Sequence, residues 1–214
     1  MTNPAITTPT MYNPAAFVEN DPAELQAIMR AASLPVLISP GKNGLLATHL
    51  PLLFEAPDRL IGHLARANPH WRDFDPAAPS LAIFTAADGY ISPSFYPTKA
   101  ETGKVVPTWN YQAVHATGRL EVTEDPAALL DIVTRLTNRY ETGRPNPWAV
   151  ASAPADFIAS QLRGIIGITL HITLLEGKNK LSQNRLKQDQ IGALAGAARE
   201  NPALAAAMRK ANGL

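Results

Sequence analysis

Two polar clusters in the sequence combine the residue types that a bound phosphate requires. The first, residues 62–69, places Arg66 and the amide of Asn68 among small residues. The second, residues 177–185, contains two lysines, an arginine and several amides. Small residues let the backbone approach an oxyanion, while N–H groups and cations donate to it. Both clusters therefore suit a phosphate, although Arg66 could also be a surface charge and residues 177–185 a solvated basic turn.

The stretch 89–115 brings aromatic rings together with short hydrogen-bonding side chains. Its rings are Tyr90, Phe95, Tyr96, Trp109 and Tyr111, and the small polar residues between them are Ser92, Ser94, Thr98, Thr108 and Asn110. Flat apolar faces beside small polar groups are what a planar ligand with polar edges needs. The same rings could instead be ordinary core residues of a proline-rich connection, since aromatic side chains are buried by default.

The sequence lacks the residues or motifs that several other kinds of site require. There is no cysteine, which excludes disulfides and thiol catalysis. The five histidines show neither His-x-His nor His-Glu-x-x-His spacing, so no metal site is predicted. Glycine-rich dinucleotide loops, Walker loops and Gly-x-Ser-x-Gly are also missing. Paired acids do not occur in the polar clusters, so glycoside hydrolysis has no support.

The composition describes an ordinary globular chain with little net charge. At 214 residues it is expected to be one domain, with or without appendages. A formal net charge of +1 gives no general reason to expect a nucleic-acid or membrane surface. Residues 1–10 have no basic n-region and no apolar h-region, and no apolar run is long enough to span a bilayer. These features predict a cytoplasmic protein without a membrane partner, and residues 1–10 are expected to form a flexible tail.

Cap and turn signals predict the elements that must position these residues. Asp21-Pro22 and Asp125-Pro126 each place an N-cap aspartate before a proline at the first helical position. Helices are predicted from residue 21, over 125–140, over 154–162, and in two segments after 186 that break near Asn201-Pro202. Strands are predicted over 34–38, 45–54, 59–64, 81–86, 110–123 and 166–175, with one more short strand within 89–115.

Two details refine this pattern. Residues 41–44 are expected to form a hairpin turn, and Pro51 argues for an edge or a bulge in its strand. Strands that follow one another, with helices inserted rather than alternating, favour a small antiparallel barrel with helices on its outside. The predicted fold is therefore mainly β with peripheral helices.

Seven segments in order resemble the PaiB-like family of FMN-binding split-barrel proteins, which is named for negative transcriptional regulation. The segments cover residues 11–14, 47–51, 62–69, 90–96, 106–111, 114–115 and 180–185. Each is weak alone, but together and in this order they are specific. Phe95 departs from the tryptophan expected there, and the alanine-rich C-terminus departs further.

The resemblance implies an antiparallel split β-barrel of FMN-binding type over residues 11–185, followed by a C-terminal helical appendage over 186–214. It also implies a homodimer with FMN near the subunit interface. The ribityl phosphate is expected near Arg66, the flavin ring near Trp109, and a closing segment after Lys180, from either subunit. The residues expected to bind FMN are Thr48, His49, Leu50, His63, Ala65, Arg66, Asn68, Thr108, Trp109, Asn110, Tyr111, Lys180, Ser182, Gln183 and Asn184.

Three functions remain open at this point. The chain could be an FMN-dependent regulator, a small FMN-dependent oxidoreductase of the flavin reductase or pyridoxamine-phosphate oxidase kind, or a barrel that has lost its flavin. DNA binding is expected to be weak, because the densest basic run, residues 178–187, is also the expected closing segment of the flavin site. The sequence names no catalytic residue, substrate or electron donor.

Overall fold

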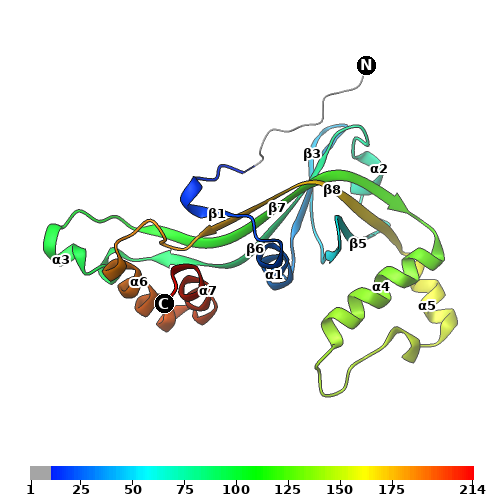
Figure 1. Ribbon diagram of the computed structural model, residues 1–214. Helices are drawn as coiled ribbons and strands as arrows, with labels where there is room; N and C mark the ends of the chain where they lie inside the picture. Colours follow the sequence, from blue (N-terminus) through cyan, green and yellow to red (C-terminus); the bar gives the residue numbers. More distant parts are fainter. Residues whose placement is uncertain (1–10) are drawn as a thin grey trace. The chain divides into compact units, whose positions relative to one another are not determined.

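The computed structural model describes residues 11–214, whose strands form one antiparallel sheet (Figure 1). Hydrogen bonds join seven strands in the order β3-β2-β6-β7-β8-β5-β4, and β1 pairs with β8. The strands are β1 Val18–Glu19, β2 Val36–Gly41, β3 Gly44–His49, β4 Leu53–Glu55, β5 Arg59–Ala65, β6 Ser80–Ile91, β7 Thr108–Thr123 and β8 Ile165–Lys180.

The helices begin where the sequence supplies caps. Asp21, Asp125 and Asn201 each accept a hydrogen bond from a backbone N–H of the first turn, and a proline follows each of them. These contacts confirm the predicted helix starts and the break near Asn201. The helices are α1 Pro22–Ala31, α2 His70–Asp73, α3 Thr98–Thr102, α4 Pro126–Glu141, α5 Ala155–Leu162, α6 Lys187–Glu200 and α7 Pro202–Asn212, with 3-10 turns η1 Ala15–Phe17, η2 Pro93–Phe95 and η3 Val150–Ser152.

The chain forms two compact units, each assembled from segments that are distant in sequence. Unit 1 contains the described residues up to Ala32 together with Phe84–His115 and Glu176–Leu214. Unit 2 contains Ser33–Ile83 and Ala116–Leu175. The long strands β6, β7 and β8 contribute residues to both units.

The core of unit 1 is built largely by the C-terminal helices. Residues 186–214, expected as an appendage, form α6 and α7, which lie side by side in Figure 1. Their buried side chains share one apolar cluster with Ile91 and Tyr96. A Cβ at Gly192 would lie 2.1 Å from the carbonyl oxygen of Phe95, and one at Gly196 would meet its ring at 2.4 Å. The glycines therefore allow α6 to pack directly on η2.

In unit 2, helix α4 packs on the sheet through a small apolar cluster. Ile132 and Leu136 of α4 contact Ile61 of β5. The neighbouring strand β8 approaches α4 at Gly167, where a Cβ would lie 3.0 Å from Ile132. Figure 1 shows α5 beside α4 in this unit.

Three strands differ most clearly from the sequence prediction. β8 continues to Lys180 instead of ending near residue 175, and β6 runs without interruption to Ile91, so the predicted separate short strand does not exist. The strand predicted over 45–54 is divided into β3 and β4, with Pro51 between them, because proline cannot donate to the ladder. The hairpin turn at 41–44 is confirmed by the pairing of Gly41 with Gly44.

Among residues 11–214, no helix has the length and apolar character needed to cross a membrane.

Candidate functional site

In unit 2, the structure joins the first predicted phosphate cluster to strand β3 by hydrogen bonds. Asn68 Nδ2 donates to Thr48 Oγ1 (3.1 Å), and Asn68 Oδ1 accepts from the backbone N–H of His70 (2.9 Å). Thr48 and Asn68, which are twenty residues apart in the chain, therefore form one unit of structure. The turn after β5 is held in place by this contact.

His70 extends this network into the interior. Its Nδ1 lies 2.8 Å from Thr48 Oγ1 and its Nε2 lies 2.9 Å from Ser39 Oγ, which in turn lies 2.7 Å from Ser80 Oγ. His70 is 1% exposed, and burial lowers its pKa. A neutral imidazole donates at one nitrogen and accepts at the other, so its tautomer decides whether the Thr48 hydroxyl proton points inward or is free for a ligand. The sequence analysis did not include His70 among the site residues.

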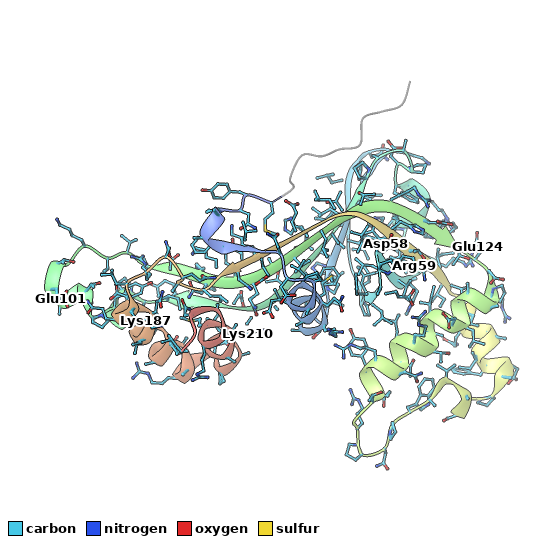
Figure 2. All side chains as sticks on the ribbon, viewed as in Figure 1. Asp58, Arg59, Glu101, Glu124, Lys187 and Lys210 are labelled. Carbon is cyan, nitrogen blue, oxygen red and sulfur yellow. The ribbon has the colours of Figure 1, made fainter. Side chains whose placement is uncertain are left out.

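All three guanidinium nitrogens of Arg66 contact oxygen atoms within unit 2. Nε donates to the carbonyl of Arg163 (2.7 Å), and NH1 forms an ion pair with Glu124 at 2.5 Å. Glu124 is labelled in Figure 2. NH2 is 3.4 Å from the carbonyl oxygen of Ile165. Arg66 is therefore more than a surface charge, and a phosphate would have to share the guanidinium with these acceptors.

The remaining predicted residues of unit 2 differ in their surroundings. His63 lies on β5, where burial lowers its pKa, and its Nδ1 has no hydrogen-bond partner among residues 11–214. His49 and Ala65 are exposed. Leu50 is buried and its backbone N–H donates to Pro35 (3.1 Å). Of this group, His63 offers an orphaned polar atom and His49 an exposed ring.

In unit 1, the second cluster is bonded to strand β7. Lys180 Nζ donates to Thr108 Oγ1 (2.5 Å) and also to the carbonyl of Trp109. Asn110 Nδ2 donates to Ser182 Oγ (2.9 Å) at a position where both side chains are buried. The predicted β7 residues and the predicted closing segment are thus in direct contact.

The last two residues of the closing segment, Gln183 and Asn184, behave differently from Lys180. Gln183 uses its amide locally: Oε1 accepts from the N–H of Leu181 (2.7 Å) and Nε2 donates to the carbonyl of Asn179 (2.5 Å). Asn184 is exposed and lines a groove with Gln183. The structure therefore gives Gln183 a role within its own turn and places Asn184 in the wall of the groove.

Lys178 was not among the predicted binding residues, yet it is central to this region. It is 5% exposed, and its Nζ donates to the carbonyl of Tyr12 (2.7 Å). The same ammonium lies 5.3 Å from the ring centre of Tyr12 and 5.4 Å from that of Tyr111. Aromatic faces attract a cation in this position. The sequence placed Lys178 in the polar cluster 177–185, and its alternation with Lys180 puts both lysines on one face of a strand.

The electrostatics of unit 1 favour an anionic or electron-rich ligand. Burial, with the charges of Lys178 and Arg185, lowers the pKa of Lys180. None of the ion pairs among residues 11–214 includes these three cations. Beside them, the exposed ring of Trp109 meets Tyr90 edge-on at 6.2 Å. Cations and flat rings without a carboxylate partner fit a flavin.

Comparison with known proteins identifies the family. The family described as "Putative FMN-binding domain" matches residues 11–174, and the chain belongs to it. A relative from Bacillus subtilis (strain 168), "Protease synthase and sporulation protein PAI 2", is 32% identical over 187 residues, covering 86% of this chain and 87% of the relative. The PaiB-like resemblance and the prediction of FMN as cofactor are thereby confirmed.

Solved structures agree on the fold. The FAD and heme binding protein from Mycobacterium smegmatis superposes with a TM-score of 0.57 at 17% identity, covering 76% of this chain and 73% of that one. The flavocytochrome Anf3 from Azotobacter vinelandii gives a TM-score of 0.55 at 16% identity, covering 76% and 68%. At such identities the likeness concerns the fold alone, and it confirms an antiparallel split β-barrel with helices.

The histidine network makes a prediction for stability against pH. Because burial lowers the pKa of His70 below its ordinary value of 6.5, the unfolded chain binds more protons than the folded chain once the pH falls below 6.5. The free energy of unfolding should therefore decrease from pH 6.5 down to the lowered pKa. His70→Gln removes this titrating group, and the decrease measured by urea unfolding should become smaller.

His49→Gln is the matched control, because His49 is exposed. It should leave the pH dependence as in the wild type. An identical slope for wild type and His70→Gln between pH 7 and about pH 5 would contradict a buried neutral His70.

Proposed function

We propose that this chain is a cytoplasmic, FMN-binding homodimer that acts as a negative regulator through its flavin or a protein partner, without a DNA-binding face of its own. One observation supports the absence of a DNA-binding face: the three lysines of the densest basic run, Lys178, Lys180 and Lys187, all donate to groups within unit 1. The regulatory half draws on the relative from Bacillus subtilis, whose name refers to protease synthesis and sporulation.

The basic run offers few cations to a nucleic acid. Lys178 is buried under Tyr12, and Lys180 donates to β7. Lys210, labelled in Figure 2, is paired with Glu24. A protein that binds DNA tightly must neutralise several phosphates with exposed lysines or arginines. With a formal net charge of +1, the chain has little net positive charge to replace them.

Each unit by itself contains residues that we propose for contact with FMN. In unit 2, Arg66 and the hydroxyl and amide groups of Thr48 and Asn68 suit the phosphate, since they combine a cation with small donors. In unit 1, Trp109 and Lys180 suit the isoalloxazine, because they combine a flat ring with a cation held against β7. The bound FMN supplies electron- or hydride-transfer chemistry, and these residues bind and orient it.

Exposed aromatic side chains and free strand edges support the homodimer. Trp109 and Tyr90 are 56% and 46% exposed although they contact one another. An exposed aromatic pair of this kind marks an interaction surface. Strands β3 and β4 end the hydrogen-bonded order of the sheet, and free strand edges also favour association.

Arg66 should matter for the phosphate of FMN. A charge-assisted contact to phosphate contributes about 1.5–3 kcal/mol, so Arg66→Ala should weaken FMN binding by about tenfold or more. Riboflavin, which has no phosphate, should bind the variant and the wild type equally. Fluorescence titration of both flavins measures the two affinities.

Arg119→Ala is the control, because Arg119 is an exposed arginine of the same unit, paired with Glu121. It should leave both affinities unchanged. Equal FMN affinity for Arg66→Ala and wild type would return Arg66 to a purely structural role with Glu124 and the 163–165 segment.

The aromatic pair should contribute to the dimer. Light scattering of the FMN-loaded protein at micromolar concentration should give twice the mass of one chain, and Trp109→Ser should shift the population toward the monomer. Trp148→Ser is the control, because Trp148 is a 46% exposed tryptophan of unit 2. A wild-type monomer with FMN bound would refute the homodimer.

DNA binding should be weak and sensitive to salt. In a mobility-shift experiment at physiological salt, the FMN-loaded protein should release DNA when competitor is added, because few free cations contact phosphates. Sequence-specific binding at nanomolar protein that survives competitor would refute the proposal. Sustained oxidation of a reduced nicotinamide by the same preparation would instead favour the small FMN-dependent oxidoreductase.

A further inference from the structure

A groove of about 440 Å³ in unit 1 lies between α3 and the residues that lead into α6. Figure 2 labels Glu101 of α3 and Lys187, the first residue of α6, on the two elements that border it. Gln188 Nε2 donates to Glu101 Oε1 (3.2 Å), which joins these elements. The volume falls in the range of small-molecule sites, about 300–1,000 Å³. We call it the Arg185 groove, after the cation in its wall.

Arg185 is held in place without a carboxylate. Its guanidinium carbon lies 4.9 Å from the centre of the Tyr96 ring, and its backbone N–H donates to Ser182 (3.0 Å). Burial raises the pKa of Tyr96, so this ring is a neutral support. No acidic residue in the described part of the chain lies within ion-pair distance of Arg185. The guanidinium also lies close to the Tyr96 hydroxyl, and its other N–H groups can donate to an oxyanion.

A second cation faces the same groove. Lys104 is exposed in the groove wall and takes part in no ion pair within residues 11–214. The one carboxylate in the wall, Asp189, is buried, and both its oxygens accept from the Thr98 hydroxyl, at 2.8 and 3.0 Å. The backbone N–H of Thr98 donates to it as well (3.2 Å). With Arg185 and Lys104 against Asp189, the groove carries one net positive charge.

The turn that directs Arg185 into the wall is strained and firmly held. Ser182 has φ of 72°, and it is the one non-glycine residue with positive φ in the described chain. A residue in this region persists only where the surrounding structure fixes it, and such residues concentrate at ligand sites. Here Asn110 donates to the buried Ser182 hydroxyl and fixes it. The turn then delivers Gln183, Asn184 and Arg185 to the groove.

We propose that the Arg185 groove binds a small organic oxyanion, a carboxylate or a phosphate monoester, between Arg185 and Lys104. The exposed amide of Asn184 stands beside the two cations, and Val105 and Leu186 provide apolar walls for a short carbon skeleton. Trp109 and Lys180, which are assigned to the isoalloxazine, do not line this groove, whereas Gln183 and Asn184, which the sequence predicted in the closing segment of the flavin site, do line it. The proposed oxyanion site is distinct from the FMN contacts assigned above, and competition with FMN tests this distinction.

The test is isothermal titration calorimetry of the full chain, with inorganic phosphate and succinate as probes. At least one probe should bind saturably at one site per chain, with FMN present and absent. Arg185→Gln and Lys104→Gln should each weaken that binding by about tenfold, because each removes a charge-assisted contact. Arg209→Gln, which changes an exposed arginine of α7 outside the groove, should leave it unchanged.

Three results would overturn the proposal. The first is no saturable binding of either probe, and the second is equal affinity in wild type and both groove variants. The third is binding that riboflavin permits and FMN abolishes, since the groove would then hold the flavin's own phosphate. Arg185→Gln also removes a contact with Tyr96, so its melting temperature is recorded. Lys104 is exposed, and its variant keeps the test decisive if Arg185→Gln unfolds.

Discussion

Unit 1 contains three neighbouring positive charges, on Lys178, Lys180 and Arg185. The structure around them must compensate these charges. Burial, together with repulsion from Lys178 and Arg185, lowers the pKa of Lys180. The chain compensates them with carbonyls and aromatic faces rather than carboxylates. Such partners hold a cation in place but leave its charge available. Cations held in this way favour the binding of an anionic group, which fits the phosphate-bearing FMN of the family.

The local elements were predictable because their signals are local. Asp21, Asp125 and Asn201 cap helices through contacts two or three residues away, so the sequence alone reveals them. The end of β8 was misplaced because the apolar alternation stops near residue 175 and a polar, basic segment begins at Gly177. In the structure a Cβ at Gly177 would lie 2.1 Å from Leu25, so glycine is needed there for α1 to pack against a strand that continues. Leu25 lies 152 residues before Gly177 in the chain, so no residue near Gly177 signals this contact.

The candidate site was predictable to the extent that its residues are neighbours in sequence. Residues 62–69 and 108–111 were found because each presents several polar groups within a few positions. His70 was missed, although it follows residues 62–69 directly, because its role depends on Thr48, Ser39 and Ser80 from other strands. The register between strands decides which of these hydroxyls contact the imidazole, and register cannot be predicted from one segment alone.

In unit 1, the buried hydrogen bond from Asn110 to Ser182 fixes the middle of the closing segment. Asn110 holds Ser182, so Lys180, two residues before it, stays against β7 while Arg185, three residues after it, reaches the groove. Because Ser182 has a strained backbone, the turn has few alternative conformations that keep both contacts. Replacing Ser182 with a residue lacking the hydroxyl would therefore disturb both positions together, whereas a change at Lys180 or Arg185 alone would be local. The polar residues before Ser182 in the segment 180–185 therefore contact β7, and those after it line the Arg185 groove.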